Sequence, residues 1–174
     1  GISVIGTNGI VEPMSEQALV DTIRVELRQR KANGAEYVLL TPGNYGSDYI
    51  QKDIGIDPKI AVLTSNFIGD ALDICKELGF KGALLIGHIG KLVKIAGGML
   101  NTHSKYGDCR MDIMAAHAGA VGLSAPLIAE MLGCATCDDA IRILKESGLC
   151  TQTLERISNR ISFIMDHRVA GEMK

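Results

Sequence analysis

The sequence contains no tryptophan, and aromatic residues make up only 4% of its 174 positions. Proteins that hold single-stranded nucleic acid stack the bases on aromatic side chains, so this scarcity argues against that class. The formal net charge of −2 also argues against a surface that coats a polyanion. No apolar run approaches the roughly 18 residues of a membrane span, and no charged-then-apolar leader opens the chain. We therefore expect a cytoplasmic protein that binds neither nucleic acid nor a membrane.

Several signatures of binding sites are also absent. The sequence has neither the GxGxxG pattern of dinucleotide-binding folds nor the GxxxxGK[ST] pattern of a P-loop. Its histidines, cysteines and aspartates show no spacing typical of a metal site, so we expect no metal. The five cysteines are an odd number in a chain with a large core, which favours reduced thiols. Cys134 and Cys137 form a CxxC pair without a second pair, and we expect packing rather than zinc or redox chemistry.

A repeated strand–loop–helix pattern occupies the first part of the chain. Hydrophobic residues make up 47% and charged residues 22%, ordinary values for one globular domain. The pattern is typical of an α/β fold: a three-layer, mainly parallel Rossmann-like sheet with helices on both faces. Apolar segments predict strands at 2–5, 37–40, 60–63 and 84–86; periodicity predicts helices at 16–32, capped by Ser15, and 67–78, capped by Thr64-Ser65-Asn66.

From residue 108 onward the sequence predicts only helices. They are expected at 109–121, from Ser124-Ala125-Pro126, after a cap at Thr136 or Asp138, and at 149–168. With no repeat and no low-complexity linker, we expect one domain over 1–174. Its sheet core would occupy about 1–106 and its extra C-terminal helices about 108–170.

Polar or glycine-rich loops follow all four predicted strands. Parallel strands place their carboxyl ends at one edge of a sheet, where ligands bind in open α/β folds. A glycine-lined crevice there suits an adenosine-type ligand, while a tight crossover turn is the alternative explanation of each loop. The residues expected to line this crevice are Gly6, Thr7, Asn8, Gly9, Thr41, Pro42, Gly43, Asn44, Ser65, Asn66 and Gly87.

The stretch 81–106 leads from the fourth strand into histidines and basic residues. His88 follows the strand and His103 lies in a polar cluster, so each is a candidate general base, with a structural role as the alternative. Basic side chains gathered here suit a ligand with several carboxylates, and a solvated helix face is the alternative. The candidate substrate-binding residues are Lys91, Lys94, Asn101, Thr102, Ser104, Lys105 and Arg110.

Five segments resemble the cobalamin-biosynthesis family CbiD: GTNGIVEPMSEQAL, LTPGNYG, SNFIGDALD, LLIGHIGKLVKIAGG and NTHSKYGDCRMDIMAAHA. The resemblance runs from Gly1 to about Ala118, and beyond it the helices are similar only in pattern. It implies a cobalt-precorrin-5B C-1 methyltransferase of the oxygen-independent pathway, which uses S-adenosylmethionine to methylate a ring carbon of a cobalt-bound corrinoid. It also implies a donor in the glycine-lined crevice and corrinoid carboxylates beside the basic residues. His103 or His88 would take up the released proton.

Members of that family have an N-terminal domain ahead of the first glycine motif, where this chain begins. We therefore expect that domain to be a partner of the chain, and to be needed for catalysis if it encloses the substrate. Two other hypotheses stay open: a non-catalytic module that binds a corrinoid or assembles with a partner, and an α/β enzyme that acts on a phosphorylated metabolite. The sequence leaves open the oligomeric state, homo-oligomers included.

Overall fold

The computed structural model describes residues 15–43, 49, 51–52, 55 and 57–174. The strand predicted at 2–5, the loop at 6–9 and Asn44 lie outside these residues. No helix of the described part combines the length and the apolarity that a membrane crossing requires.

The elements follow the predicted order closely. Within the described ranges the strands are β1 (Tyr37–Thr41), β2 (Ala61–Leu63) and β3 (Gly82–Leu85). The helices are α1 (Glu16–Ala32), α3 (Ile68–Glu77), α4 (Ile89–Ala96), α5 (Arg110–Gly119), α6 (Ala125–Leu132), α7 (Cys137–Glu146) and α8 (Cys150–Arg168), with short 3-10 turns η2 (Pro58–Ile60) and η3 (Ser104–Tyr106).

Local capping signals explain where two of the helices begin. The Ser15 hydroxyl accepts a hydrogen bond from the backbone of Ala18 at 3.2 Å, which satisfies a free N–H in the first turn of α1. Thr136 caps α7 in a reciprocal capping box with Asp139. Both caps were predicted from the sequence, Thr136 as one of two options.

The predicted cap of α3 is wrong. Phe67 occupies the N-cap position and makes no side-chain cap hydrogen bond. The backbone N–H of Phe67 bonds to the carbonyl of Thr64 at 2.9 Å, which forms a turn ahead of the helix. The Asn66 amide oxygen accepts from the Thr102 hydroxyl instead of from the helix backbone. A tertiary contact has therefore taken the side chain that the sequence assigned to the cap.

The three described strands form one parallel sheet in the order β2-β1-β3. Leu39 of the central strand pairs with Ala61 on one side and with Leu84 on the other. The carboxyl ends of all three strands therefore meet at the same edge, as expected for parallel strands.

The described helices reach one face of this sheet. Val38, Leu40 and Val62 point to that face and share a core with side chains of α1 and α3. On the opposite face Leu39 and Ala61 are buried, and within the described residues no helix side chain joins their cluster. Leu63 and Leu84 on that face are 50% and 59% exposed. The α/β class is thus confirmed, with a helical layer seen on one face.

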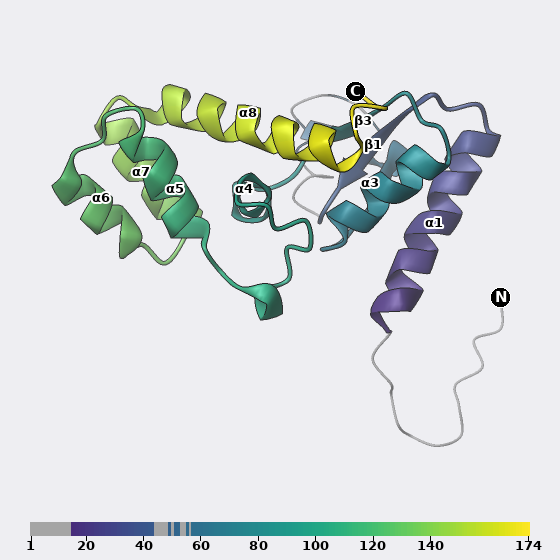
Figure 1. Ribbon diagram of the computed structural model, residues 1–174, viewed down its shortest axis with the longest axis horizontal. Helices are drawn as coiled ribbons and strands as arrows, with labels where there is room; N and C mark the ends of the chain where they lie inside the picture. The colour runs from purple at the N-terminus through teal and green to yellow at the C-terminus, as the bar shows by residue number, and fades with distance from the viewer. Residues whose placement is uncertain (1–14, 44–48, 50, 53–54, 56) are drawn as a thin grey trace, which may run out of the picture.

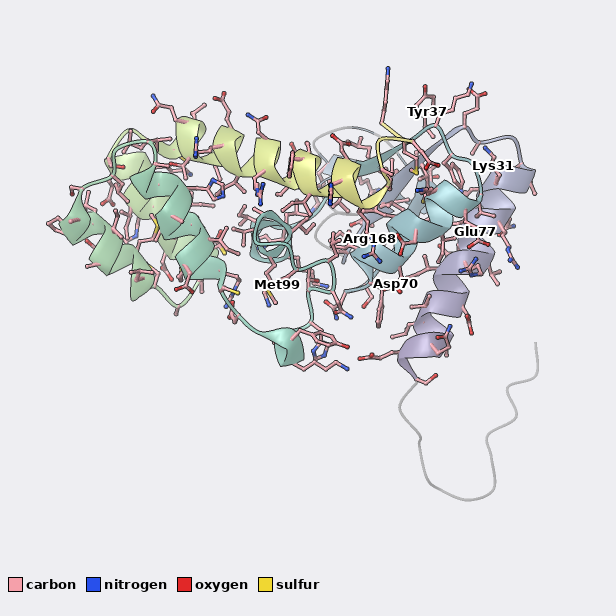
Figure 2. The ribbon with its side chains drawn as sticks, in the orientation of Figure 1. Lys31, Tyr37, Asp70, Glu77, Met99 and Arg168 are labelled. Carbon is pink, nitrogen blue, oxygen red and sulfur yellow. The ribbon has the colours of Figure 1, made fainter. Side chains whose placement is uncertain are left out.

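Two hydrophobic cores lie along the molecule. The first joins the sheet to α1 and α3, and the second joins α4 to α5, α6, α7 and α8. Helix α8 spans both, while α1 and α3 lie at one end of the molecule and α5, α6 and α7 at the other (Figure 1). At the C-terminal end of α8 the side chain of Arg168 lies beside α3 (Figure 2). It forms a two-pronged ion pair with Asp73 of α3, at 2.8 and 2.6 Å.

Candidate functional site

Three loops meet at the carboxyl edge of the sheet. They follow β1 at Pro42 and Gly43, β2 at Thr64, and β3 at Gly87. The backbone N–H of Thr64 bonds to the carbonyl of Thr41 at 2.8 Å, so the first two loops leave the sheet together. The convergence of these loops is the geometry that the sequence predicted for the ligand crevice.

Lys91 links these loops. Its ammonium group donates to the carbonyl of Pro42 at 2.5 Å and lies 3.5 Å from the carbonyl of Ser65. Burial and the nearby charge of Lys94 both lower the Lys91 pKa. Lys91 was predicted to bind substrate carboxylates, but here it holds backbone carbonyls of the loops predicted to bind the donor.

A buried hydroxyl group at this edge lacks a partner. Thr64 is fully buried, and its Oγ1 makes no hydrogen bond to any described residue. An unsatisfied buried hydroxyl is costly in free energy, and a partner outside the described residues would remove that cost. Gly43 also leaves space among the described residues, since a Cβ there would have its nearest described neighbour 3.9 Å away.

The segment after α4 packs against the loop that follows β2. Asn101 forms an antiparallel bridge with Phe67, and Thr102 bonds to Asn66 twice, through its backbone N–H at 3.0 Å and its hydroxyl at 3.1 Å. The fold therefore brings Asn101 and Thr102, predicted for the substrate, against Asn66, predicted for the donor.

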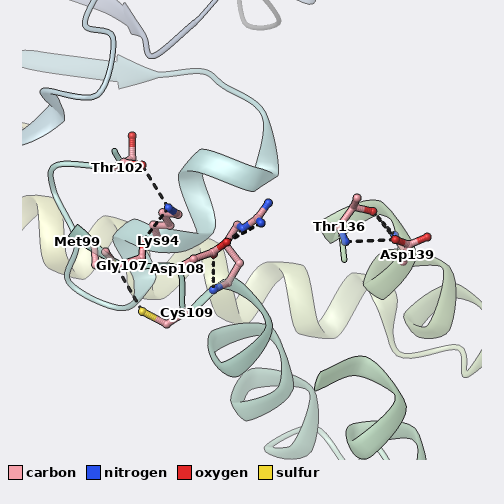
Figure 3. A network of polar contacts seen from close by, with 9 residues as sticks. Lys94, Met99, Thr102, Gly107, Asp108, Cys109, Thr136 and Asp139 are labelled. Atoms are coloured by element: carbon pink, nitrogen blue, oxygen red, sulfur yellow. Dashed lines mark hydrogen bonds and ion pairs between the residues drawn. The ribbon is translucent and has the colours of Figure 1, made fainter. Parts of the chain in front are cut away.

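Lys94 is buried inside this segment. Only 5% of the residue is exposed, and its ammonium group donates to the carbonyls of Thr102 at 3.3 Å and Gly107 at 3.0 Å (Figure 3). Two carbonyl acceptors compensate part of the cost of burying a charge. Lys94 thus fixes the loop that carries His103, and its ammonium group does not face solvent as a carboxylate ligand would need.

Both histidines that were predicted as general bases occupy N-cap positions. His88 precedes α4 and accepts from Gly90 N–H at 3.2 Å, and His103 precedes η3 and accepts from Lys105 N–H at 3.0 Å. Each cap uses Nδ1 as the acceptor, so the proton of the neutral ring lies on Nε2. Nε2 of His88 also lies 3.9 Å from Asp138. In this geometry either ring would have to release its cap to accept a proton.

The remaining candidate substrate-binding residues do not share a common partner. Arg110 forms a two-pronged pair with Asp108, both contacts at 2.7 Å, which lowers the Asp108 pKa. Lys105 instead pairs with Glu16 at the start of α1. Ser104 is exposed. The basic residues that the sequence grouped together therefore form no single positive surface.

All five cysteines lie in the described part of the chain. All five are unpaired, and no described group of three or more His, Cys, Asp or Glu side chains is placed to hold a metal ion. Burial raises the pKa of the Cys137 thiol, which packs in the second core. Cys134 and Cys137 thus behave as a packed pair.

Two residues of the site were not among the predicted ones. Thr64 directly follows a strand, and that position could have suggested it as a site residue. The sequence pattern instead predicted that Thr64-Ser65-Asn66 caps a helix. Asp108 neutralises Arg110 from two residues away, and only the loop conformation brings the two side chains together.

Comparison with known proteins finds one family model and several curated relatives that are similar to this chain. The family model described as CbiD, C-terminal domain, matches residues 101–174. A protein of Ruminiclostridium cellulolyticum named cobalt-precorrin-5B C(1)-methyltransferase is 45% identical over 168 residues, 97% of this chain and 44% of the relative. Relatives of the same name from Alkaliphilus metalliredigens and Photorhabdus laumondii are 43% and 41% identical, over 100% and 92% of this chain and 46% and 42% of theirs.

These matches extend the resemblance that the sequence motifs suggested. The similarity continues through the helical part beyond Ala118, where the motifs end. The chain spans a little under half the length of these curated relatives. No solved structure matches it significantly. By its similarity to these relatives along its length and by the C-terminal model it matches, the chain belongs to the CbiD family.

Proposed function

We propose that this chain is part of an S-adenosylmethionine-dependent methyltransferase that methylates ring carbon C-1 of cobalt-precorrin-5B in anaerobic cobalamin biosynthesis. The observation that carries the proposal is the 45% identity, over 97% of this chain, to a relative with that name. Because the chain covers 44% of that relative, the proposal concerns a protein of family length. The present chain would supply the loops at the carboxyl edge of the sheet.

The proposed donor site is the crevice formed by the loops after β1, β2 and β3. The residues there suit a nucleoside-type ligand, since the loops carry small and polar side chains and a Cβ at Gly43 would have its nearest described neighbour 3.9 Å away. Ser65, Asn66 and Gly87 would complete it together with Thr41 and Pro42. When bound, S-adenosylmethionine supplies an electrophilic methyl group on sulfur. The task of these residues is then to orient the donor and to exclude water.

The proposed substrate side is the segment 101–110 packed against that crevice. Asn101 and Thr102 pack against the loop after β2. The Lys94 ammonium group binds the same segment through hydrogen bonds to the carbonyls of Thr102 and Gly107. His103 or His88 is proposed to take up the proton that the corrinoid loses. That role requires the ring to give up its cap, so the imidazole would move or turn when the substrate binds.

The test is calorimetric titration of this chain with S-adenosylhomocysteine. We expect micromolar binding, weakened by Gly87→Ala, whose new methyl would lie 2.7 Å from the Pro42 ring, and also weakened by Gly43→Leu, whose side chain would fill space in the proposed crevice. If this chain does not bind but the full-length Ruminiclostridium relative does, the remaining length of the protein completes the site. Absence of binding by both proteins would contradict the donor assignment.

One observation favours a second candidate, a non-catalytic module that binds a corrinoid. Both histidines proposed as bases are occupied as caps. A protein of this kind would bind a corrinoid and would show no measurable affinity for S-adenosylhomocysteine. The same titration therefore separates the two functions.

We also propose that the sheet is covered on both faces in a protein of family length, which would give the predicted three layers. Support comes from Leu63 and Leu84, large apolar residues that are 50% and 59% exposed on a sheet of parallel strands. Parallel sheets are normally buried on both faces. The occupant would be the part of the relatives that this chain does not span.

A further inference from the structure

A second cleft lies away from the carboxyl edge, between α5 and α8. Its volume is about 460 Å³, which is in the range of small-molecule sites. His117 contributes from α5, and α8 contributes Arg156, Asn159, Arg160 and Phe163 along one side. None of these residues belongs to the site described above, and the methyltransferase proposal gives none of them a role.

The cleft carries positive charge that the described chain does not neutralise. Arg156 and Arg160 lie one helical turn apart, where like charges repel each other. Neither forms an ion pair with a described residue, and the contact that Arg160 does make is over the ring of Phe163, at 5.0 Å. Glu155 also lines the cleft but pairs with neither arginine. Both guanidinium groups line the cleft and are available to a ligand, and that of Arg160 lies over the Phe163 ring.

His117 adds an imidazole ring to the lining of the cleft. Its Nδ1 is buried and has no hydrogen-bond partner in the described part of the chain. Burial, with the charges of Arg156 and Arg160, lowers the His117 pKa and so favours the neutral ring. A bound anion would satisfy the arginines and would lie beside the imidazole ring, which lines the same cleft.

We propose that the cleft between α5 and α8 binds a carboxylate carried on an apolar or planar body, with Arg156 and Arg160 holding the carboxylate and Phe163 contacting the body. Guanidinium groups match carboxylates through paired hydrogen bonds, and the exposed Phe163 ring gives the body an apolar surface. Asn159, between the two arginines on the same helix, offers a further donor.

Two sources supply such a carboxylate. One is the rim of a corrinoid whose side chains are free acids, a choice that rests on the proposed function. The other is a small free carboxylate. Both share the chemistry that the arginines recognise, and only the body attached to the carboxylate differs.

The experiment titrates the chain with three probes: cobyrinic acid, whose side chains are carboxylates; hydroxocobalamin, in which they are amides; and citrate. Calorimetry gives affinity, and the NMR signal of the His117 ring reports occupancy of the cleft. We expect cobyrinic acid to bind, to raise the His117 pKa, and to bind about tenfold more weakly to Arg156→Gln/Arg160→Gln. The control Arg28→Gln/Arg142→Gln removes the same charge from exposed positions of α1 and α7 and should leave affinity unchanged.

The possible outcomes either support the proposed carboxylate site or overturn it. Arginine-dependent binding of citrate without cobyrinic acid supports the site with a free carboxylate as its ligand. Equal affinity in the Arg156→Gln/Arg160→Gln variant and the control, or no binding by either carboxylate, overturns the site. Hydroxocobalamin binding as tightly as cobyrinic acid also overturns it. Titration with S-adenosylhomocysteine should be unaffected by the arginine changes, so failure of the donor site is recognised separately from failure of the cleft.

Discussion

The ammonium group of Lys91 donates a hydrogen bond of 2.5 Å to the carbonyl of Pro42, from the first turn of α4 to the loop after β1. The same group lies 3.5 Å from the carbonyl of Ser65, after β2. Because α4 itself follows β3, one side chain connects the loops of all three described strands. Its charge serves to position loops at the proposed donor site.

Lys91→Met should loosen these loops. The substitution keeps a side chain of similar length but leaves the Pro42 carbonyl without its charged donor. Removal of a half-buried charge offsets part of the resulting loss in stability. We expect the free energy of unfolding to fall by about 1 kcal/mol and the affinity for S-adenosylhomocysteine to fall about tenfold. Urea denaturation and calorimetry measure the two effects. The control is Lys145→Met on the exposed side of α7, and unchanged affinity in Lys91→Met would rule out the positioning role.

Gly87→Ala should distort the loop after β1. The added Cβ would lie 2.7 and 2.8 Å from two ring carbons of Pro42, and a proline ring cannot rotate away. We expect a loss of about 1–3 kcal/mol in the free energy of unfolding, typical of overpacking. Gly43→Ala is the matched control, because the nearest described atom to its Cβ would be the Lys91 ammonium nitrogen, at 3.9 Å. Equal stability of the two variants would show that the loop absorbs the methyl group.

Variants of His88 distinguish its role as a helix N-cap from a role as general base. Alanine removes the acceptor for Gly90 N–H and should cost about 1 kcal/mol of stability, whereas asparagine is a good cap and should restore it. If His88 or His103 also takes up a proton, its asparagine variant would keep stability and lose methyl transfer. Thermal unfolding and a methyl-transfer assay, run on both variants at each position, give the answer. Full transfer activity in both asparagine variants would leave each histidine with the cap alone.

Cys75 should be the least reactive thiol. It is fully buried, and burial raises its pKa from 9.0 to about 12. At pH 8 we expect native protein to protect Cys75 from a disulfide reagent that reacts with all five thiols after unfolding. Rapid labelling of Cys75 in native protein, located by mass spectrometry, would contradict its buried position.

The same thiol should make stability depend on pH. Between pH 9 and about 12 the unfolded thiol loses its proton while the folded one keeps it, so the free energy of unfolding falls as pH rises. Cys75→Ala should lack this contribution. Denaturant titrations of both proteins at pH 8 and pH 10 measure the difference, and equal slopes with pH would refute it.

The exposed sheet face should bind a hydrophobic dye. Leu63→Thr/Leu84→Thr removes apolar surface from that face, and both residues are at least half exposed. We expect weaker dye fluorescence and a change in unfolding free energy within about 0.5 kcal/mol per site, as for surface substitutions. A large loss of stability would mean that these side chains pack in a core.

Local sequence determined most of the secondary structure. The start of α1 at Ser15 and the capping box of α7 depend on residues within one turn of each other, and α8 follows from a long apolar stripe. Such interactions act between near neighbours in the chain, so a pattern of residue types is enough to predict them. The three described strands were predicted for the same reason, because a buried parallel strand shows as a short apolar run in the sequence.

Tertiary structure alone decided the partners of the polar residues. Asn66 was expected to cap α3, but Thr102, 36 residues away, takes its amide oxygen. Lys91 and Lys94 were expected to face a ligand, but backbone carbonyls of distant loops take their ammonium groups. A side chain's type states what it can bond, whereas its partner depends on which loops the parallel sheet brings to one edge. That choice is made by packing between segments far apart in the chain, which no local pattern records.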